Sequence, residues 1–228
     1  MNQGLIVALV ILLVVGFMVY GYLASEKRKK ELSAWAAAKG FSFTPAKDRG
    51  LDGRFPNYGC LHQGSRRYGF NIIEGTWQSH TFLGFDYHYE TYSTDSKGHR
   101  QTHHHHFSAV ILSSALPLKP LFLRAEGFFD RVKSFFGYDD IDFESAEFSK
   151  AFYVSAKDKR WAYDVLHARA IELLLDSPRF SIQFDHDTLI AFRGNRFSPQ
   201  DFESAATVLN GLLDQLPDYV VQQLTQSA

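Results

Sequence analysis

The sequence has one cysteine, Cys60, and the lack of a second thiol excludes an intramolecular disulfide. It also lacks an excess of positive charge, since 24 Lys and Arg residues stand against 25 Asp and Glu residues, a formal net charge of −1. Such a chain has no broad positive field to attract nucleic acid, so we expect no nucleic-acid partner. Pro-rich, Gln-rich and Gly/Ser-rich linkers and internal repeats are missing as well, which argues against a flexible tether or a repeat array.

The motifs of the common enzyme classes are absent too. The sequence contains no G-x-S-x-G elbow, no P-loop, no H-E-x-x-H helix and no G-x-G-x-x-G turn. We therefore expect no cofactor and favour binding over catalysis. Cys60 falls in a predicted strand at 58–62, where a small buried thiol is the usual case.

What the sequence does have is one long apolar run at residues 5–23, without a charged residue. At ~1.5 Å per residue a helix of this length spans roughly 28 Å, close to the ~30 Å hydrocarbon core of a bilayer. The run predicts a transmembrane helix that contacts the lipid bilayer. A cleaved signal peptide is the competing interpretation. Against it, no Lys or Arg precedes the run, the apolar core exceeds the ~7–15 residues of such peptides, and Tyr22-Leu23-Ala24 is a poor cleavage signal.

Basic residues flank this run on one side only. Four of them follow it closely, and none precedes it: Lys27, Arg28, Lys29 and Lys30. Because positive residues stay on the cytoplasmic side, we expect a single-pass protein of the bacterial inner membrane, with its N-terminus outside and its main domain in the cytoplasm. The same four side chains are candidates for contact with anionic lipid head groups, although a topology signal alone would explain them.

Four segments follow from these patterns: a tail at 1–4, a transmembrane helix at 5–24, a helical stalk at 25–40 and a soluble domain at 41–228, with a possible subdivision near 125–145. The stalk is predicted because it consists of strong helix formers. Leu32, Trp35 and Ala36 form one apolar stripe along it, which should dock on the domain, and Gly40 is a natural stop.

The soluble part alternates between patterns typical of strands and of helices. We expect strands at 41–44, 58–62, 67–74, 81–92, 103–112, 121–124 and 148–155, and a hairpin of 180–184 with 188–192. Pro117 and Pro120 should end the strand at 103–112. Helices are expected at 125–137, 157–176 and 198–215, the last capped by Ser198 and restarting after Pro217. Short connections between strands indicate an α+β fold with a mostly antiparallel sheet and packed helices. The strand at 81–92 alternates between aromatic and polar residues, which predicts one buried and one exposed face.

Histidines gather on the hairpin that this strand forms with residues 103–112. His103 and His105 share a strand face and His88 could lie across from one of them, so these three are a candidate site for zinc, copper or nickel. The alternative is weak adventitious binding, because four consecutive histidines at 103–106 put ligands on both faces. A further hypothesis is an enzyme that uses three residues of one strand face as an acid–base set: Asp86, His88 and Glu90.

Two groups of acidic residues are explained better by loop and turn structure than by metal binding or catalysis. The loop at 139–144 lacks the spacing of a calcium loop, and Asp185 with Asp187 fits turn chemistry better than catalysis.

The layout resembles a family of uncharacterised bacterial single-pass membrane-anchored proteins. The residues that carry the resemblance are the basic stretch that leads into 32–43, the strand segment 85–89, and 142–144 with 148–149 downstream. The resemblance covers most of the chain, its motifs are low in specificity, and it implies neither an activity nor site residues. Together with the anchor it favours a membrane-anchored cytoplasmic binding domain of unknown ligand, without catalysis.

Overall fold

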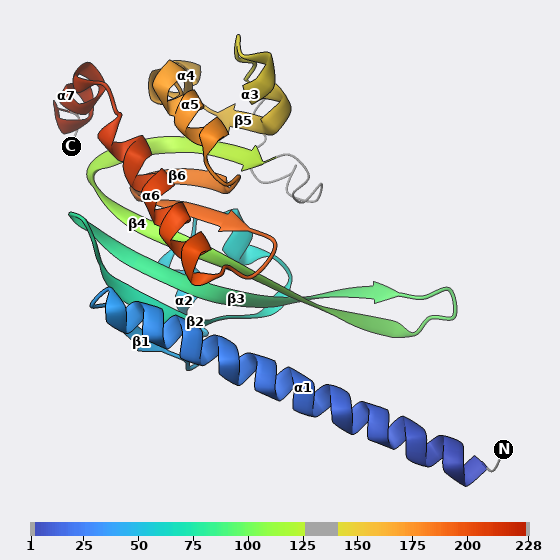
Figure 1. Ribbon diagram of the computed structural model, residues 1–228. Helices are drawn as coiled ribbons and strands as arrows, with labels where there is room; N and C mark the ends of the chain where they lie inside the picture. The colour runs from blue at the N-terminus through green and yellow to red at the C-terminus, as the bar shows by residue number, and fades with distance from the viewer. Residues whose placement is uncertain (1–2, 126–140, 227–228) are drawn as a thin grey trace.

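The computed structural model describes residues 3–125 and 141–226, which form a long N-terminal helix, a curved sheet and a layer of shorter helices (Figure 1). The helices are α1 (Gln3–Ala38), α2 (Leu51–Arg54), the 3-10 helix η1 (Gly59–His62), α3 (Ala146–Ala151), α4 (Lys159–Val165), α5 (Ala168–Asp176), α6 (Pro199–Asp214) and α7 (Asp218–Gln226). The strands are β1 (Ser42–Thr44), β2 (Ser65–Trp77), β3 (His80–Thr94), β4 (Arg100–Ala125), β5 (Phe152–Ala156) and β6 (Ser181–Arg193).

All strand pairs in the sheet are antiparallel, which confirms the predicted α+β class. The order is β1-β2-β3-β4-β5, and β6 also pairs with β4. The 26-residue strand β4 is central because it pairs with β3 from Arg100 to Leu112, with β6 between Ser108 and Leu123, and with β5 at its end. The sheet therefore curls around β4, and the far end of the β3–β4 hairpin projects beyond the other strands (Figure 1).

The sheet is covered on both faces. The main core lies between one face and the helices α1, α4, α5, α6 and α7, and includes Phe82, Val110 and Leu112. A second cluster on the other face includes Phe85 and Tyr87 and is covered by the segment that carries α2 and η1. The prediction that β3 exposes one face is therefore wrong. The segment with α2 and η1 covers the aromatic face, and Asp86, His88 and Glu90 on the polar face are buried as well.

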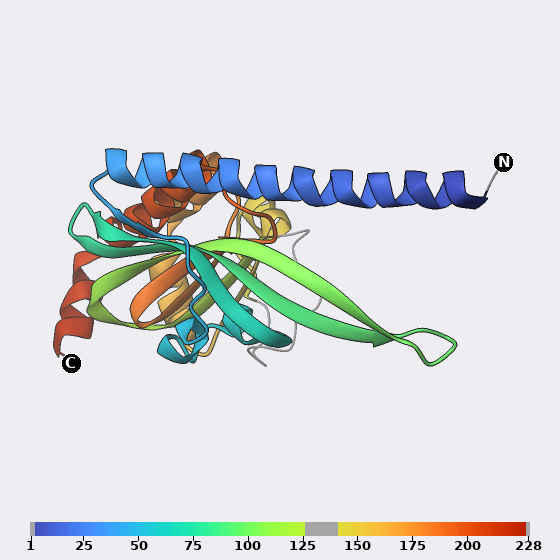
Figure 2. The ribbon, with the colours of Figure 1, turned by 90° about the horizontal axis from the view of Figure 1, so that it is seen from below.

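The helix α1 runs without a break across the predicted boundary between anchor and stalk. It ends as predicted at Gly40, whose φ of +72° suits glycine. The Phe41 N–H donates to the Ala36 carbonyl at 2.8 Å and the Gly40 N–H to the Ala37 carbonyl at 3.1 Å, which together form a Schellman motif. Figure 2 shows that the C-terminal half of α1 lies along the sheet while the N-terminal half projects past it.

The predicted apolar stripe does dock. Leu32 and Ala36 are fully buried. Trp35 stacks on Phe202 of α6 at a ring-centroid distance of 5.9 Å and meets Phe82 of β3 edge-on at 6.3 Å. The helical periodicity of the apolar residues therefore predicted correctly which face of α1 packs against the domain.

Two predicted strands are partly wrong. Residues 58–62 contain η1, because Tyr58, Cys60 and Leu61 are all buried against the sheet and an alternating strand cannot turn three such residues to one side. The buried thiol is as expected. Residues 148–155 divide into the end of α3 and the strand β5, since the Ser145 hydroxyl caps α3 by accepting from the Phe148 N–H.

Other differences concern breaks along single elements. The helix predicted at 157–176 is two helices, α4 and α5, which meet at His167, where the ring contacts the Gln215 carbonyl at 2.8 Å. The predicted hairpin at 180–192 is the single strand β6, with His186 at φ +52°. It follows β4 through the register shifts around Leu118, so β4 continues past the prolines that were expected to end it.

The Ser198 cap that begins α6 and the restart of the chain as α7 after Pro217 are both confirmed, and the structure adds a capping box in which Asp201 accepts from the Ser198 N–H. The helix predicted at 125–137 lies almost wholly outside the described residues, as do the first two residues of the acidic loop at 139–144.

Candidate functional site

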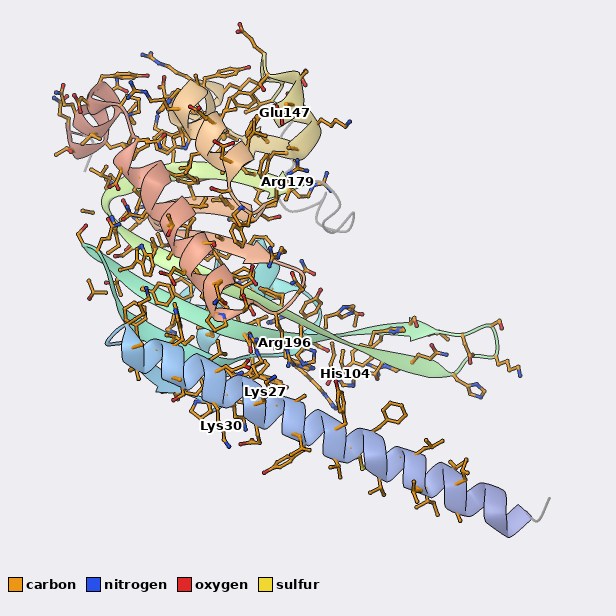
Figure 3. The ribbon with its side chains drawn as sticks, viewed as in Figure 1. Lys27, Lys30, His104, Glu147, Arg179 and Arg196 are labelled. Atoms are coloured by element: carbon orange, nitrogen blue, oxygen red, sulfur yellow. The ribbon has the colours of Figure 1, made fainter. Side chains whose placement is uncertain are left out.

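Polar residues form a line on the sheet face that receives α1. The antiparallel register pairs Asp86 with Ser108, His88 with His106, and Glu90 with His104. Directly paired residues share a face, so these six form one surface, which we call the polar stripe: Asp86, His88, Glu90, His104, His106 and Ser108. The stripe runs from Asp86, which contacts Arg28 of α1, to Glu90 and His104 farther out on the hairpin (His104 is labelled in Figure 3).

Asp86 is the buried end of the stripe and is fully inaccessible to solvent. Arg28 of α1 binds it in a bidentate pair, with Nε to Oδ2 at 2.8 Å and Nη2 to Oδ1 at 2.6 Å. Asn71 of β2 donates to Oδ2 at 2.9 Å, and the Ser108 hydroxyl donates to Oδ1. A buried carboxylate that accepts four hydrogen bonds links the three elements that donate them, α1, β2 and β4.

The same network joins α1 to the loop before α6. Arg28 Nη1 donates to the Phe197 carbonyl at 2.8 Å, and the Phe197 N–H donates to Ser108 Oγ at 2.9 Å. Asn71 holds its place in the network with a left-handed backbone at φ +50°, within a register shift of β2. Strain of this kind persists only where surrounding contacts enforce it. The docking of α1 is thus built from polar as well as apolar contacts.

The middle of the stripe brings two imidazoles and a carboxylate together. His88 Nε2 lies 3.2 Å from His104 Nδ1, and His104 Nδ1 lies 3.6 Å from Glu90 Oε1. His88 and Glu90 are buried, whereas the His104 side chain is 59% exposed. Tyr68 of β2 stacks on the His88 ring at 4.5 Å.

The buried His88 and the half-buried His106 both favour the neutral form. Burial lowers the pKa of His88 below its usual range, while a hydrogen bond with the Arg66 carbonyl partly offsets that effect. Burial, followed by the charge of Arg196, lowers the pKa of His106 to about 4. At neutral pH these side chains therefore offer lone pairs rather than positive charge.

The predicted metal set of His88, His103 and His105 does not converge. His103 pairs with Thr91 and His105 with Tyr89, which places both on the face opposite His88. Their ring nitrogens contact hydroxyls there, His103 with Ser93 at 2.7 Å and His105 with Thr91 at 2.8 Å. The alternation within 103–106 was correct, but the cross-strand register, which the sequence does not specify, puts the even-numbered histidines beside His88.

The four basic residues proposed for lipid head groups have different surroundings. Arg28 binds Asp86 and its side chain is only 17% exposed, so little of it is available to lipid head groups. Lys27 pairs with Glu31 at 3.8 Å and Lys29 with Glu26 at 2.7 Å, both within α1. Lys30 is exposed (Figure 3).

The acid–base set of Asp86, His88 and Glu90 does share one face, as predicted. Asp86 is saturated by donors, and Glu90 Oε2 already accepts from the Tyr92 hydroxyl at 3.0 Å. The arrangement therefore gives Asp86 no role as a proton acceptor. A separate cavity of about 800 Å³ lies where β4 bends against α4 and α7, and the Lys119–Asp158 ion pair, at 2.7 Å, lines it.

Comparison with known proteins identifies a shared fold. No family model and no curated protein matches the chain. A solved structure that is similar is the crystal structure of the mycobacterial trehalose monomycolate transport factor A, TtfA. It is 12% identical with a TM-score of 0.60, and the match covers 83% of this chain and 96% of that one. At this identity the likeness shows the fold alone.

Proposed function

We propose that the protein is a membrane-anchored interaction domain without catalytic activity, held by α1 in the bacterial inner membrane with its main domain in the cytoplasm. The observation that carries the proposal is the division of α1 into two halves. The half from Ala8 to Leu23 is apolar on all sides and exposed, while the half from Arg28 to Ala38 is docked on the sheet.

The exposed half supports an anchor. Its large apolar side chains from Leu9 to Leu23 are between 46% and 75% exposed. The core helix of a soluble protein would meet the same criteria of length and composition, but none of the most apolar 18-residue window of this helix is buried. A helix that is apolar all round and uncovered by its own domain has lipid as its natural solvent. The orientation rests on the basic residues that follow the run.

The fixed docking of α1 supports a positioning role. Arg28 and Trp35 bind α1 to β3 and α6, so the domain keeps a fixed orientation relative to the anchor. The β3–β4 hairpin projects in the same general direction as the exposed half of α1 (Figures 1 and 2). From Asp86 to Thr94 it extends about 26 Å, whereas Arg28 lies only about 7.5 Å from Leu23 along the helix.

A hairpin of that length extends, measured along α1, beyond Leu23, which is the residue of the apolar run nearest to the domain. Its tip carries Asp95, Lys97 and Arg100, which cannot enter hydrocarbon unpaired. We therefore expect α1 to enter the bilayer bent or tilted away from the hairpin, which leaves the tip in the head-group layer. There it is placed to meet lipid head groups and partners embedded in the same membrane.

The similar fold of TtfA, which is described as a transport factor, fits an accessory role of this kind. By analogy, we propose that the domain holds partners of a membrane transport or assembly process.

The test combines location, processing and topology of the full chain. We expect the protein to stay in the membrane after carbonate extraction. Its intact mass should show that residues 5–23 are retained. A reporter fused after Ala228 that fluoresces only in the cytoplasm should be active. A soluble or shortened chain, or a signal only from a periplasmic reporter, contradicts the proposal. Turnover of a hydrolase substrate that Glu90→Gln abolishes would contradict the non-catalytic part.

A further inference from the structure

The middle of the polar stripe has the composition of a metal site. We propose that His88 Nε2, Glu90 Oε1 and His104 Nδ1 bind one divalent transition-metal ion of the zinc type. Two imidazole nitrogens and one carboxylate oxygen are a ligand set that zinc accepts, with a fourth position left for water. This inference is independent of the proposed function, because it depends on the hairpin and not on the anchor.

The separations between donor atoms suit one small ion. In a tetrahedral zinc site with bonds near 2.0–2.1 Å, ligand atoms lie about 3.4 Å apart. The distances here are 3.2 Å between His88 Nε2 and His104 Nδ1 and 3.6 Å between His104 Nδ1 and Glu90 Oε1. One ligand atom from each of the three residues lies within 4.8 Å of the other two, so small side-chain adjustments bring the set to tetrahedral spacing.

Neighbouring groups orient two of the ligands. The Arg66 carbonyl lies 3.3 Å from His88 Nδ1, so a proton on Nδ1 leaves the Nε2 lone pair free to bind metal. The Tyr92 hydroxyl occupies Glu90 Oε2 at 3.0 Å, which leaves Oε1 for the ion. Such outer hydrogen bonds are the usual support of metal-binding histidines and carboxylates.

The exposure of the proposed site and the charges around it determine how strongly it can bind a metal ion. His88 and Glu90 are buried, and the open side of the site lies at His104, whose side chain is 59% exposed. Arg66 Nε is 3.7 Å from Glu90 Oε2, but the Arg66 side chain is 75% exposed and free to move away. Lys47 lies near His88 and Arg196 near His106, and their positive charges weaken the binding of a cation to the stripe.

The experiment is a calorimetric titration of ZnSO₄ into the chelator-treated full chain in detergent, without a polyhistidine tag. We expect one ion per chain. His104→Ala and Glu90→Gln should each weaken the affinity by more than about 100-fold, beyond the 10–100-fold lost when a group that supports a ligand is removed. The matched control is His103→Ala, which removes an adjacent exposed histidine from the opposite face and should change nothing.

Three outcomes would overturn the proposal. They are no heat above that of dilution, more than one weak ion per chain, or equal losses in His103→Ala and His104→Ala, which would mean adventitious binding by exposed histidines. Circular dichroism of each variant checks that it is folded. Binding of Co²⁺ provides a second readout, because His104→Ala should remove the tetrahedral visible absorption of the wild-type complex while His103→Ala keeps it.

Discussion

The two halves of α1 are one continuous helix with two different environments. From Leu9 to Leu23 the large apolar side chains are at least 46% exposed, whereas Leu32 and Ala36 in the other half are fully buried. The first half is apolar on every side, and the second is apolar on one stripe only. A helix without a polar face needs an apolar solvent all round, whereas one with a single stripe needs only a partner surface.

The difference shows that hydrophobicity and periodicity answer separate questions. Hydrophobicity says that a residue is driven out of water, and periodicity says from which side it will be covered. In the docked half a charged residue, Arg28, also contributes, because it faces a buried carboxylate. If this comparison is right, substitutions in the two halves should have separable effects on membrane association and on domain stability.

The largest effect should come from charging the exposed half. Leu12→Arg with Val15→Arg puts two cations near the centre of the apolar run, each at a penalty of about 2.5–3.5 kcal/mol for insertion. We expect loss of membrane association, measured by fractionation, with the domain still folded. Ala34→Arg, an exposed position in the other half, is the control and should stay in the membrane. Retention of the double variant in the membrane would refute the anchor.

The next largest effect should come from breaking the polar dock. Asp86→Ala leaves Arg28 without its partner in a site where it is 17% exposed, so we expect a loss of about 3 kcal/mol in the free energy of unfolding, at the low end for a broken buried pair. Urea unfolding in detergent measures it, with the exposed Asp142→Ala as control. In a double-mutant cycle, Arg28→Met with Asp86→Ala should lose less than the sum of the two single changes.

A smaller effect should come from the apolar dock. Trp35→Ala removes the ring that contacts Phe82 and Phe202. Because Trp35 is partly exposed, we expect a loss of about 2 kcal/mol, below the range for a fully buried Trp. The midpoint of urea unfolding measures it, and Lys30→Ala on the exposed side of the same helix should leave that midpoint unchanged. Equal midpoints for wild type and Trp35→Ala would mean that the aromatic contacts do not stabilise the dock.

The smallest effect should come from the exposed ion pair between α1 and α6. Lys39 Nζ lies 2.7 Å from Glu203 Oε1, with side chains that are 35% and 42% exposed. Solvent screens such pairs, so Glu203→Gln should lower the free energy of unfolding by less than about 1 kcal/mol, and less still at high salt. A loss as large as that of Asp86→Ala would show that surface charge, rather than the buried pair, holds the helix.

Local patterns predicted much of the fold, and the failures share a cause. The stripe through Leu32, the stop at Gly40 and the cap at Ser198 depend on neighbours in sequence, and all three are confirmed. The segments 58–62 and 180–192 depend on what packs against them. The first became a 3-10 helix because its apolar residues all face the sheet, and the second stayed one strand because it follows β4 around a bend.

For the candidate site, the sequence predicted that histidines gather on the β3–β4 hairpin, but not which of them share a face with His88. Alternation along a strand is a property of the backbone, so His103 and His105 had to share a face, as did Asp86, His88 and Glu90. Which residue of β4 lies opposite His88 depends on the register across the turn, and a shift of one residue exchanges the two faces. The structure selects His106 as that partner and so brings His104 to Glu90.

By itself the sequence determined one apolar helix, the lack of an intramolecular disulfide, an α+β class and the ends of several helices, because these depend on composition and on contacts a few residues apart. Only the tertiary structure decided that Arg28 binds Asp86, that both faces of β3 are buried, and which histidines meet. These contacts join residues that are distant in the chain. Their pairing is set by the packing of the whole sheet, which no short-range pattern encodes.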